Sequence, residues 1–348
     1  MIKFINHTKA SFNNFLPLYH EKEVNVLKNV TNLLHISYPI IQGGMGNVSH
    51  AKLAAAISNA GGLGTIGAGT MTAEKVEQLI IDTKRMTDKP YCINIPINVQ
   101  PYLSEVVEVV KKHRVPVVSL SAGNPRPFIP VFQALGTKVI CVVATVQQAK
   151  KAEQAGADII VAEGYEAAGI NSQQETTTFT LIPQVVQAVS IPVIAAGGIA
   201  DGKGLAAVWA LGAAGVQMGT RFIATKDADV HEIYKQHILQ ANDTGTTIVG
   251  RSLGLHRRLL KTVYAQTLKE AETTVSLEQF QQLTDERHHW LGAMEGNETE
   301  GHMNGGQIAG YITDLPTVDS LLRAMMIEAW GTIDNMHRSI KHEERMKQ

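Results

Sequence analysis

The sequence predicts a (β/α)₈ barrel followed by a helical cover. One observation is a series of short apolar runs, at 39–42, 63–66, 91–95, 116–120, 138–143, 158–162, 192–196 and 215–218. The runs are continuously apolar instead of alternating, which is typical of parallel strands that are buried on both faces. The other observation is that segments with helical spacing separate the runs. Eight strands are more than a doubly wound sheet usually has, so a closed barrel is expected.

The order of elements predicts four regions. Residues 1–36 form an N-terminal arm, and residues 37–226 form the barrel, with helices expected at 51–60, 73–86, 102–113, 146–155, 179–189 and 204–211. After Thr220 the alternation ends, and residues 227–300 are predicted to be a helical lid with helices at 229–241 and 276–291. Residues 301–348 are expected to return to the barrel through a closing amphipathic helix from about Val318 to His342.

Composition excludes several classes of protein. Hydrophobic residues make up 44% of the 348 residues and charged residues 18%, with a net charge of −1, so neither nucleic acid nor a membrane is an expected partner. The only cysteines, Cys92 and Cys141, lie in apolar runs and are expected to be free thiols. No metal-binding spacing, secretory signal or membrane-spanning stretch is present in the sequence, which favours a soluble cytoplasmic protein.

Glycine-bearing loops follow three neighbouring strands. The strand at 158–162 ends in Glu163-Gly164, the next ends in the run 197–202, and the last ends in 219–221. Glycine lets a backbone approach a ligand and expose its N–H groups, and successive loops of this kind at one end of a barrel form phosphate sites. The sequence therefore predicts binding of a phosphorylated small molecule or cofactor.

Two earlier strands carry further candidate residues. The first ends in Gly43-Gly44-Met45-Gly46, where a glycine pair lets the chain lie flat against a planar ligand and Met45 offers a polarizable contact. The third strand carries Asn94, a single polar residue in an apolar run. A buried amide needs partners, so Asn94 is expected either to bond a ligand or to brace a loop.

Together with 39–46, 60–64, 195–202 and 217–222, the stretch 162–172 resembles the nitronate monooxygenase (2-nitropropane dioxygenase) family. That family includes the FMN-dependent enoyl-acyl-carrier-protein reductase II. The resemblance runs from about Pro39 to Ala265, and residues 305–310 form a further short region of similarity. It implies a TIM barrel with FMN at the carboxyl ends of the strands.

The resemblance also implies which residues contact FMN. Gly44 and Met45 would line the flavin ring, Asn94 and Glu163 would hydrogen-bond it, and Ala168 would approach it through its backbone. The phosphate-binding residues would be Gly197, Gly198, Gln217, Met218, Gly219 and Thr220.

One position departs from the family pattern. Where the family usually has Glu-Ala-Gly-Gly-His, this chain has 166–170 ending in Ile170, so the histidine that serves as base or substrate contact is missing and the catalytic residue is unknown. A hydrocarbon cannot accept a proton, whereas a nitronate is already deprotonated. Glu163, in contrast, favours a reductase, because the reductases usually have Glu at this position and the monooxygenases more often have Gln. A replacement base could come from the lid histidines, which are His231, His237, His256, His288, His289 and His302.

Several functions remain open at this point. The preferred one is oxidation of alkyl nitronates by O₂, and the alternative is NAD(P)H-dependent reduction of an enoyl thioester or a quinone. A phosphate-binding isomerase or lyase without redox chemistry, and a flavin-binding protein that has lost its activity, belong to other classes. The sequence leaves open whether the chain forms a homodimer.

Overall fold

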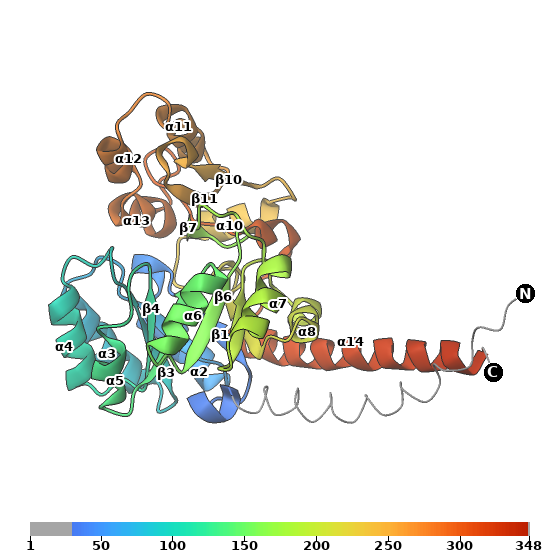
Figure 1. Ribbon diagram of the computed structural model, residues 1–348. Coiled ribbons are helices and arrows are strands. Elements are labelled where there is room, and N and C mark those ends of the chain that lie inside the picture. Colours follow the sequence, from blue (N-terminus) through green and yellow to red (C-terminus); the bar gives the residue numbers. More distant parts are fainter. Residues whose placement is uncertain (1–29, 347–348) are drawn as a thin grey trace, which may run out of the picture.

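The computed structural model describes residues 30–346, and a parallel barrel forms its centre (Figure 1). The strand order is β1-β9-β8-β6-β5-β4-β3-β2. The sheet closes where Ile41 of β1 bridges Leu63, just before β2. The strands are β1 (Ile40–Gln42), β2 (Gly64–Gly67), β3 (Tyr91–Pro96), β4 (Val117–Ser121), β5 (Lys138–Val143), β6 (Ile159–Glu163), β8 (Val193–Ala196) and β9 (Gly215–Met218). The predicted barrel is confirmed, with each strand within a residue or two of its predicted ends.

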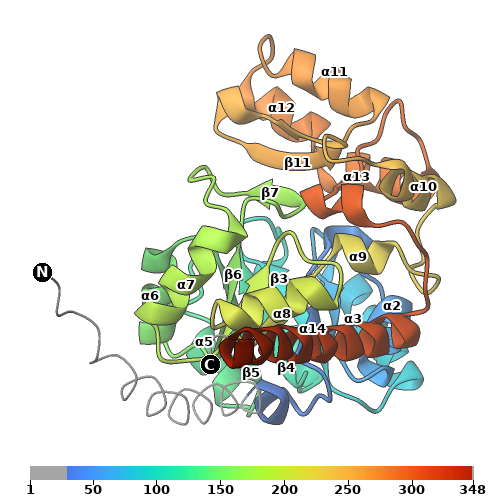
Figure 2. The ribbon, with the colours of Figure 1, turned by 90° about the vertical axis from the view of Figure 1, so that its right-hand side faces the viewer.

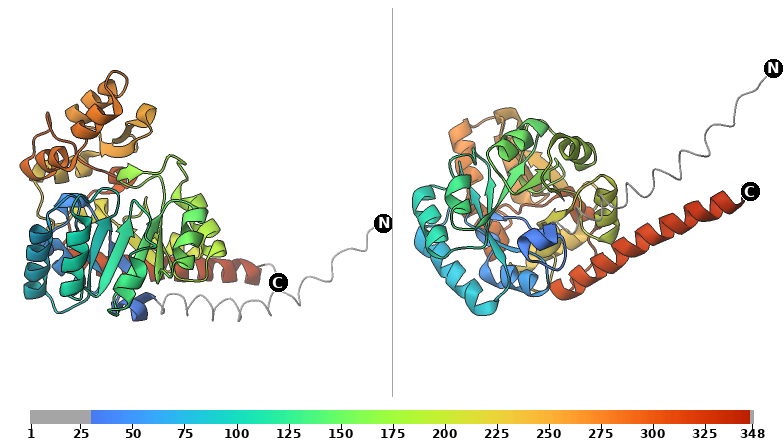
Figure 3. Two further views of the ribbon diagram at one scale, coloured as in Figure 1. Left: turned by 60° about the vertical axis from the view of Figure 1, so that its left-hand side comes forward. Right: turned by 60° about the horizontal axis from the view of Figure 1, so that its bottom comes forward.

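Helices surround the barrel on its outer side, as the view from below in Figure 3 shows. They are α2 (Ala51–Asn59), α3 (Ala73–Met86), α4 (Leu103–Lys112), α5 (Ile129–Gln133), α6 (Val146–Gln154), α7 (Thr178–Ala188) and α8 (Gly202–Ala210). The short, buried α9 (Thr220–Ile223) instead follows β9 at the carboxyl end of the barrel. The short α5 was not predicted, because a five-residue helix shows too little periodicity.

A short helical stretch at residues 30–34 closes the amino-terminal end of the barrel. Val30 and Leu34 are fully buried against inward-facing strand residues such as Ile41 and Ile159. The rest of the predicted N-terminal arm, residues 1–29, lies outside the described residues.

Residues 227–300, here called the cover, lie above the carboxyl ends of the strands (Figures 1 and 2). Their helices are α10 (Glu232–Gln240), α11 (Val263–Ala271), α12 (Leu277–Leu283) and α13 (Glu286–Glu295), with a 3₁₀ turn η2 (Arg251–Leu253). The cover also contains strands β10 (Thr246–Val249) and β11 (His256–Leu260). Strand β11 pairs with both β10 and β7 (Gly169–Asn171), which belongs to the loop after β6.

The two strands of the cover correct the expectation of a wholly helical segment. The signal for them was present in the β-branched run 246–249, which lies between Gly245 and Gly250. Gly250 and Gly254 adopt left-handed φ angles of 78° and 72°, which reverse the chain between β10 and β11. The predicted helix at 276–291 is also interrupted, because α12 ends at Leu283 and Asp285 caps the start of a second helix, α13.

The remaining residues run back along the barrel. After the turn η3 (Gln307–Tyr311), the long helix α14 (Val318–Met346) packs on α8. There the rings of Trp209 and Trp330 lie 5.2 Å apart. Beyond this contact α14 projects away from the barrel (Figures 1 and 3). The turn η1 (Gly46–Val48) lies much earlier in the chain, directly after β1. None of the helices in residues 30–346 is long and apolar enough to cross a membrane, and Cys92 and Cys141 are free and buried, as predicted.

Candidate active site

A cavity of about 380 Å³ lies at the carboxyl ends of the strands, between the barrel and the cover. Every residue that the sequence predicted for the cofactor site lines this cavity: Gly44, Met45, Asn94, Glu163, Ala168, Gly197, Gly198, Gln217, Met218, Gly219 and Thr220. They come from the ends of β1, β3, β6, β8 and β9 and from the loop before β7. Parallel strands bring their carboxyl ends to one face of the barrel, which is why residues far apart in sequence meet here.

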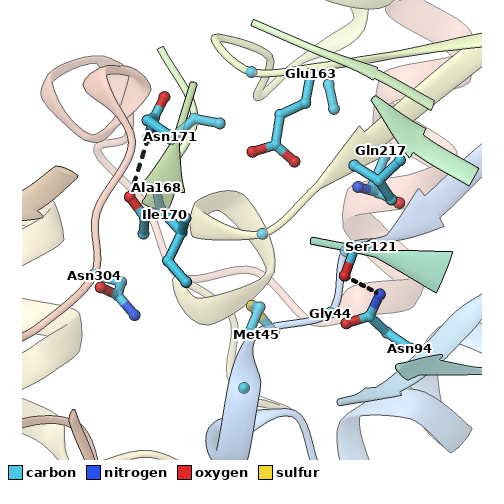
Figure 4. A pocket seen from close by; sticks show the side chains of 18 of the residues that line it. Gly44, Met45, Asn94, Ser121, Glu163, Ala168, Ile170, Asn171, Gln217 and Asn304 are labelled. Carbon is cyan, nitrogen blue, oxygen red and sulfur yellow. Dashed lines mark hydrogen bonds between the residues drawn. The ribbon is translucent and has the colours of Figure 1, made fainter. Parts of the chain in front are cut away.

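Gly44 and Asn94 are packed so closely that no side chain fits at position 44. A Cβ atom on Gly44 would lie 2.3 Å from the Asn94 Oδ1 atom. The Asn94 Nδ2 group donates to Ser121 Oγ at 3.1 Å (Figure 4). It also donates to the Ser119 carbonyl at 3.3 Å. Asn94 therefore braces β4 with its amide nitrogen, which leaves Oδ1 beside Gly44 at the cavity wall.

The loops after β8 and β9 contribute exposed backbone. Gly197 and Gly198 have φ angles of 98° and 74°, a conformation that residues with a side chain rarely adopt. Thr220 Oγ1 accepts a hydrogen bond from the Gly306 N–H at 3.0 Å, which attaches the segment after the cover to the mouth of the barrel. The Thr220 hydroxyl hydrogen stays available as a donor.

Glu163 ends β6, and its carboxyl group points into the cavity (Figure 4). The side chain is half-buried. Burial raises the pKa of Glu163 to about 7, because the charged form loses its water. Near neutral pH this group is therefore divided between its acid and carboxylate forms.

Ile170 lies in β7 and lines the cavity (Figure 4). Its side chain is 55% exposed, which is unusual for an isoleucine in a strand. Directly opposite in β11 is Arg257, which also lines the cavity. The end of the cavity near β7 thus combines a hydrocarbon surface with a guanidinium group.

Of the cover histidines proposed as replacement bases, His289 is the one that lines the cavity. Its side chain is 1% exposed and stacks on His302, with the ring centroids 5.3 Å apart. His289 Nε2 lies 3.2 Å from Asn304 Nδ2, and Nδ1 lies 3.6 Å from Glu286 Oε2. Because both nitrogens face protein groups, His289 forms part of the wall.

Other lining residues were not found from the sequence. They are Tyr234, Arg257 and Glu286 of the cover and Asn304 of the segment that follows it. No motif marks them, because the pairing of β11 with β7 and the packing of α13 bring them to the cavity.

The fold and the site define an enzyme of the barrel class with a glycine-lined ligand cavity. A family model described as nitronate monooxygenase matches residues 28–101 and 97–328. The chain therefore belongs to the nitronate monooxygenase family, and it is an oxidoreductase.

Individual relatives agree with this assignment. The chain is 35% identical to a probable nitronate monooxygenase of Staphylococcus haemolyticus, over 80% of this chain and 90% of the relative. It is 32% identical to a protein of Rhodococcus jostii, over 88% of this chain and 96% of the relative. That protein is named (3aS,4S,5R,7aS)-5-hydroxy-7a-methyl-1-oxo-octahydro-1H-indene-4-carboxyl-CoA dehydrogenase. The structure of FabK from Thermotoga maritima is similar with a TM-score of 0.86 and 41% identity, over 89% of this chain and 98% of FabK.

Proposed function

We propose that the enzyme binds one FMN non-covalently and oxidises alkyl nitronates with O₂. The observation that carries the choice of substrate is Ile170, an exposed hydrocarbon in the cavity wall where a proton-accepting side chain would be needed for a neutral nitroalkane. A nitronate has already lost that proton, so its oxidation needs no base at this position.

The residues present fit a flavin mononucleotide. The backbone at Gly44, which has no room for a side chain, would lie along the ring with Met45 beside it. Asn94 Oδ1 would accept a hydrogen bond, and the Glu163 carboxyl would accept one or, when protonated, donate one. The backbone at Gly197 and Gly198, together with residues 217–220, would hold the phosphate. When bound, FMN supplies the capacity to accept electrons from an organic substrate and pass them to O₂ or another acceptor.

The protein's own residues then determine which substrate is favoured. Ile170 supplies an apolar contact for the alkyl part of the substrate, and Arg257 places a positive charge on the same face of the β7–β11 pair. Glu163 carries less negative charge than an ordinary glutamate near neutral pH, because its pKa is raised to about 7. An anionic substrate is repelled less by such a carboxyl group than by one that is fully ionised.

A second candidate is NAD(P)H-dependent reduction of an enoyl thioester or a quinone. Glu163 favours it, because a carboxyl group with a pKa near 7 can donate a proton to a reduced product. The similarity to a carboxyl-CoA dehydrogenase and to FabK also supports it. The apolar surface of Ile170 would accept an acyl chain as readily as an alkyl nitronate.

Steady-state assays on the purified holoenzyme separate the two candidates. We expect oxygen consumption with the pre-formed anion of 2-nitropropane and little with neutral 2-nitropropane. The proposal is wrong if neither compound supports oxygen consumption while an enoyl thioester or a quinone supports oxidation of NADH or NADPH. An absorbance spectrum, followed by chromatography of the heat-released cofactor, tests for FMN directly, and recovery of FAD or of no flavin would contradict the proposal.

We also propose that the enzyme is a cytoplasmic homodimer. Free, buried cysteines are typical of a reducing compartment. Support for the dimer comes from α14, where the exposed apolar residues Ile327, Trp330, Ile333, Met336 and Ile340 recur at three- and four-residue intervals. Most of them lie beyond residue 328, where the match to the family model ends. A second copy of α14 is the occupant that we propose for this face.

Light scattering coupled to size-exclusion chromatography tests the dimer. We expect a dimer for the wild type, a monomer for Met336→Glu, and a dimer for the control Asn335→Glu, which changes an exposed residue on another side of α14. A monomeric wild type would contradict the proposal, and cell fractionation tests the compartment.

A further inference from the structure

Strand β11 carries two consecutive arginines with different surroundings. Arg258 donates from Nη2 and Nε to the Tyr165 carbonyl at 2.9 and 3.1 Å, and its guanidinium lies 4.9 Å from the centre of the Tyr165 ring. Arg257 points to the other face of the strand, as consecutive strand residues do. There it lines the cavity, and no hydrogen bond holds its guanidinium within residues 30–346. Arg258 therefore fastens the cover to the barrel loop, whereas Arg257 is available to a ligand.

The position of Arg257 is fixed by the backbone. It lies directly opposite Ile170, and the flanking pairs His256–Asn171 and Arg258–Gly169 continue the same register. Directly opposite residues in an antiparallel pair extend their side chains from the same face. The guanidinium is thus held beside the apolar surface of Ile170.

The acidic neighbours of Arg257 come from the start of α13. Glu286 and Asp285 attract its charge, but the Asp285 carboxylate accepts hydrogen bonds from the His288 N–H and lies 2.7 Å from His288 Nδ1. Glu286 Oε2 lies 3.6 Å from His289 Nδ1. Burial lowers the pKa of Arg257, which means that the site disfavours its charge when no anion is bound. A half-buried cation without a hydrogen-bonded partner is costly, and an anionic ligand would offset that cost.

We propose that Arg257 is the anion-binding residue of the substrate site and that it binds the two oxygens of a nitronate group. This inference rests on the proposed oxidation of nitronates. A planar guanidinium offers two parallel N–H groups that match two oxygens on one atom, a geometry that a nitronate shares with a carboxylate. Ile170 then contacts the alkyl substituents. Arg257 would thus bind the charged group of the substrate and Ile170 its neighbouring hydrocarbon part.

The test uses isobutyrate, which has the shape and charge of the 2-nitropropane anion but cannot be oxidised in the same way. Calorimetry measures its binding to the holoenzyme of the wild type, Arg257→Met, Arg257→Lys and the control Arg251→Met. Arg251 is a suitable control because it is exposed and pairs with Glu175. We expect binding to weaken about 10- to 100-fold in Arg257→Met, as for loss of a charged hydrogen bond, less in Arg257→Lys, and not in Arg251→Met.

Neutral isobutyramide shows whether packing or charge is responsible. Its affinity should be unchanged in Arg257→Met, and an equal loss for both ligands would overturn the inference. Unchanged isobutyrate binding in Arg257→Met, or none to the wild type, would overturn it as well. If isobutyrate depends on Arg257 but the wild type does not oxidise the nitronate, the anion site stands and the proposed function falls. If nitronate oxidation proceeds in Arg257→Met with an unchanged KM, the proposed function stands and the anion site at Arg257 falls.

Discussion

The Thr220 hydroxyl accepts the backbone N–H of Gly306, although the two residues are 86 positions apart in the chain. The bond joins the end of the barrel's last strand to the segment that follows the cover. Position 306 has little room for a side chain, because a Cβ there would lie 2.9 Å from the Glu166 carbonyl oxygen. This hydrogen bond and the close packing at Gly306 therefore hold the segment after the cover against the mouth of the cavity.

Replacing Thr220 by valine should lower both the stability of the fold and the binding of the cofactor. The buried Gly306 N–H would lose its acceptor, which costs about 1–3 kcal/mol of unfolding free energy. Chemical denaturation measures this cost, and flavin content measures cofactor loading. Thr220→Ser keeps the hydroxyl and should retain most of both properties. Equal stability of the valine and serine variants would contradict this role for Thr220.

Substitution of Gly198 by valine should abolish binding of FMN. Its φ of 74° is strained for any side chain, by about 1–2 kcal/mol, and a Cβ there would already lie 3.6 Å from the Glu166 Cβ, so a branched side chain would shift the loop that lines the cavity. Gly136→Val is a matched control away from the cavity, because Gly136 has a φ of 80° and a Cβ there would meet nothing within 4 Å. We expect similar losses of thermal stability but loss of flavin only in Gly198→Val. Flavin retained at the wild-type level in Gly198→Val would exclude these amides as the phosphate site.

Introducing a base at position 170 should broaden the substrate range. In Ile170→His, turnover of neutral 2-nitropropane should rise by up to about 10²–10⁴-fold, the usual contribution of a general base. Turnover of the pre-formed anion should change little, because no proton has to be removed. The gain should appear as pH rises through the histidine pKa, and Ile170→Gln serves as the polar control that cannot act as a base. A gain of the same size in Ile170→Gln would show that polarity, and not proton transfer, limits the wild type.

Glu163 should make the stability of the cofactor-free protein depend on pH. Its pKa is about 7 in the folded protein and lies near the ordinary value of 4.5 when unfolded, so the folded state holds its proton over a wider range. Stability from this group is therefore greatest at low pH and is lost as pH rises from about 4.5 to 7, with no further loss above that range. Urea denaturation of the wild type and of Glu163→Gln should show this difference in slope. Parallel pH profiles of the two proteins would be inconsistent with a buried carboxyl group.

The barrel and the cofactor residues could be predicted because their signals are local. Each strand is a continuous apolar run, and Gly44, Gly197 and Gly198 mark the loop ends where a backbone must come close to a ligand. The sequence could not decide whether Asn94 bonds a ligand or braces a loop. The structure shows that its amide nitrogen braces β4.

The cover was harder to predict because its geometry depends on pairing between distant segments. Strand β7 has only three residues, which is too short for a recognisable strand pattern. The pairing of Ile170 with Arg257 of β11 could therefore not be predicted from the sequence. The role of the glycines after the cover also depends on distant segments, because Gly301 packs against Gly292 and Gly305 against Leu260, at distances that admit no Cβ. We predict that the cover moves and that the substrate enters between it and the barrel. Hydrogen exchange with and without isobutyrate would test the motion.

We propose that a nitronate gives its electrons to a flavin bound in this cavity. Anaerobic mixing of the holoenzyme with the 2-nitropropane anion, followed by visible absorbance, tests it most directly. We expect the oxidised-flavin absorbance to fall on mixing and to return when O₂ is admitted. Absorbance that is unchanged by the nitronate but falls with NADH or NADPH would contradict nitronate oxidation and assign the enzyme to the reductases.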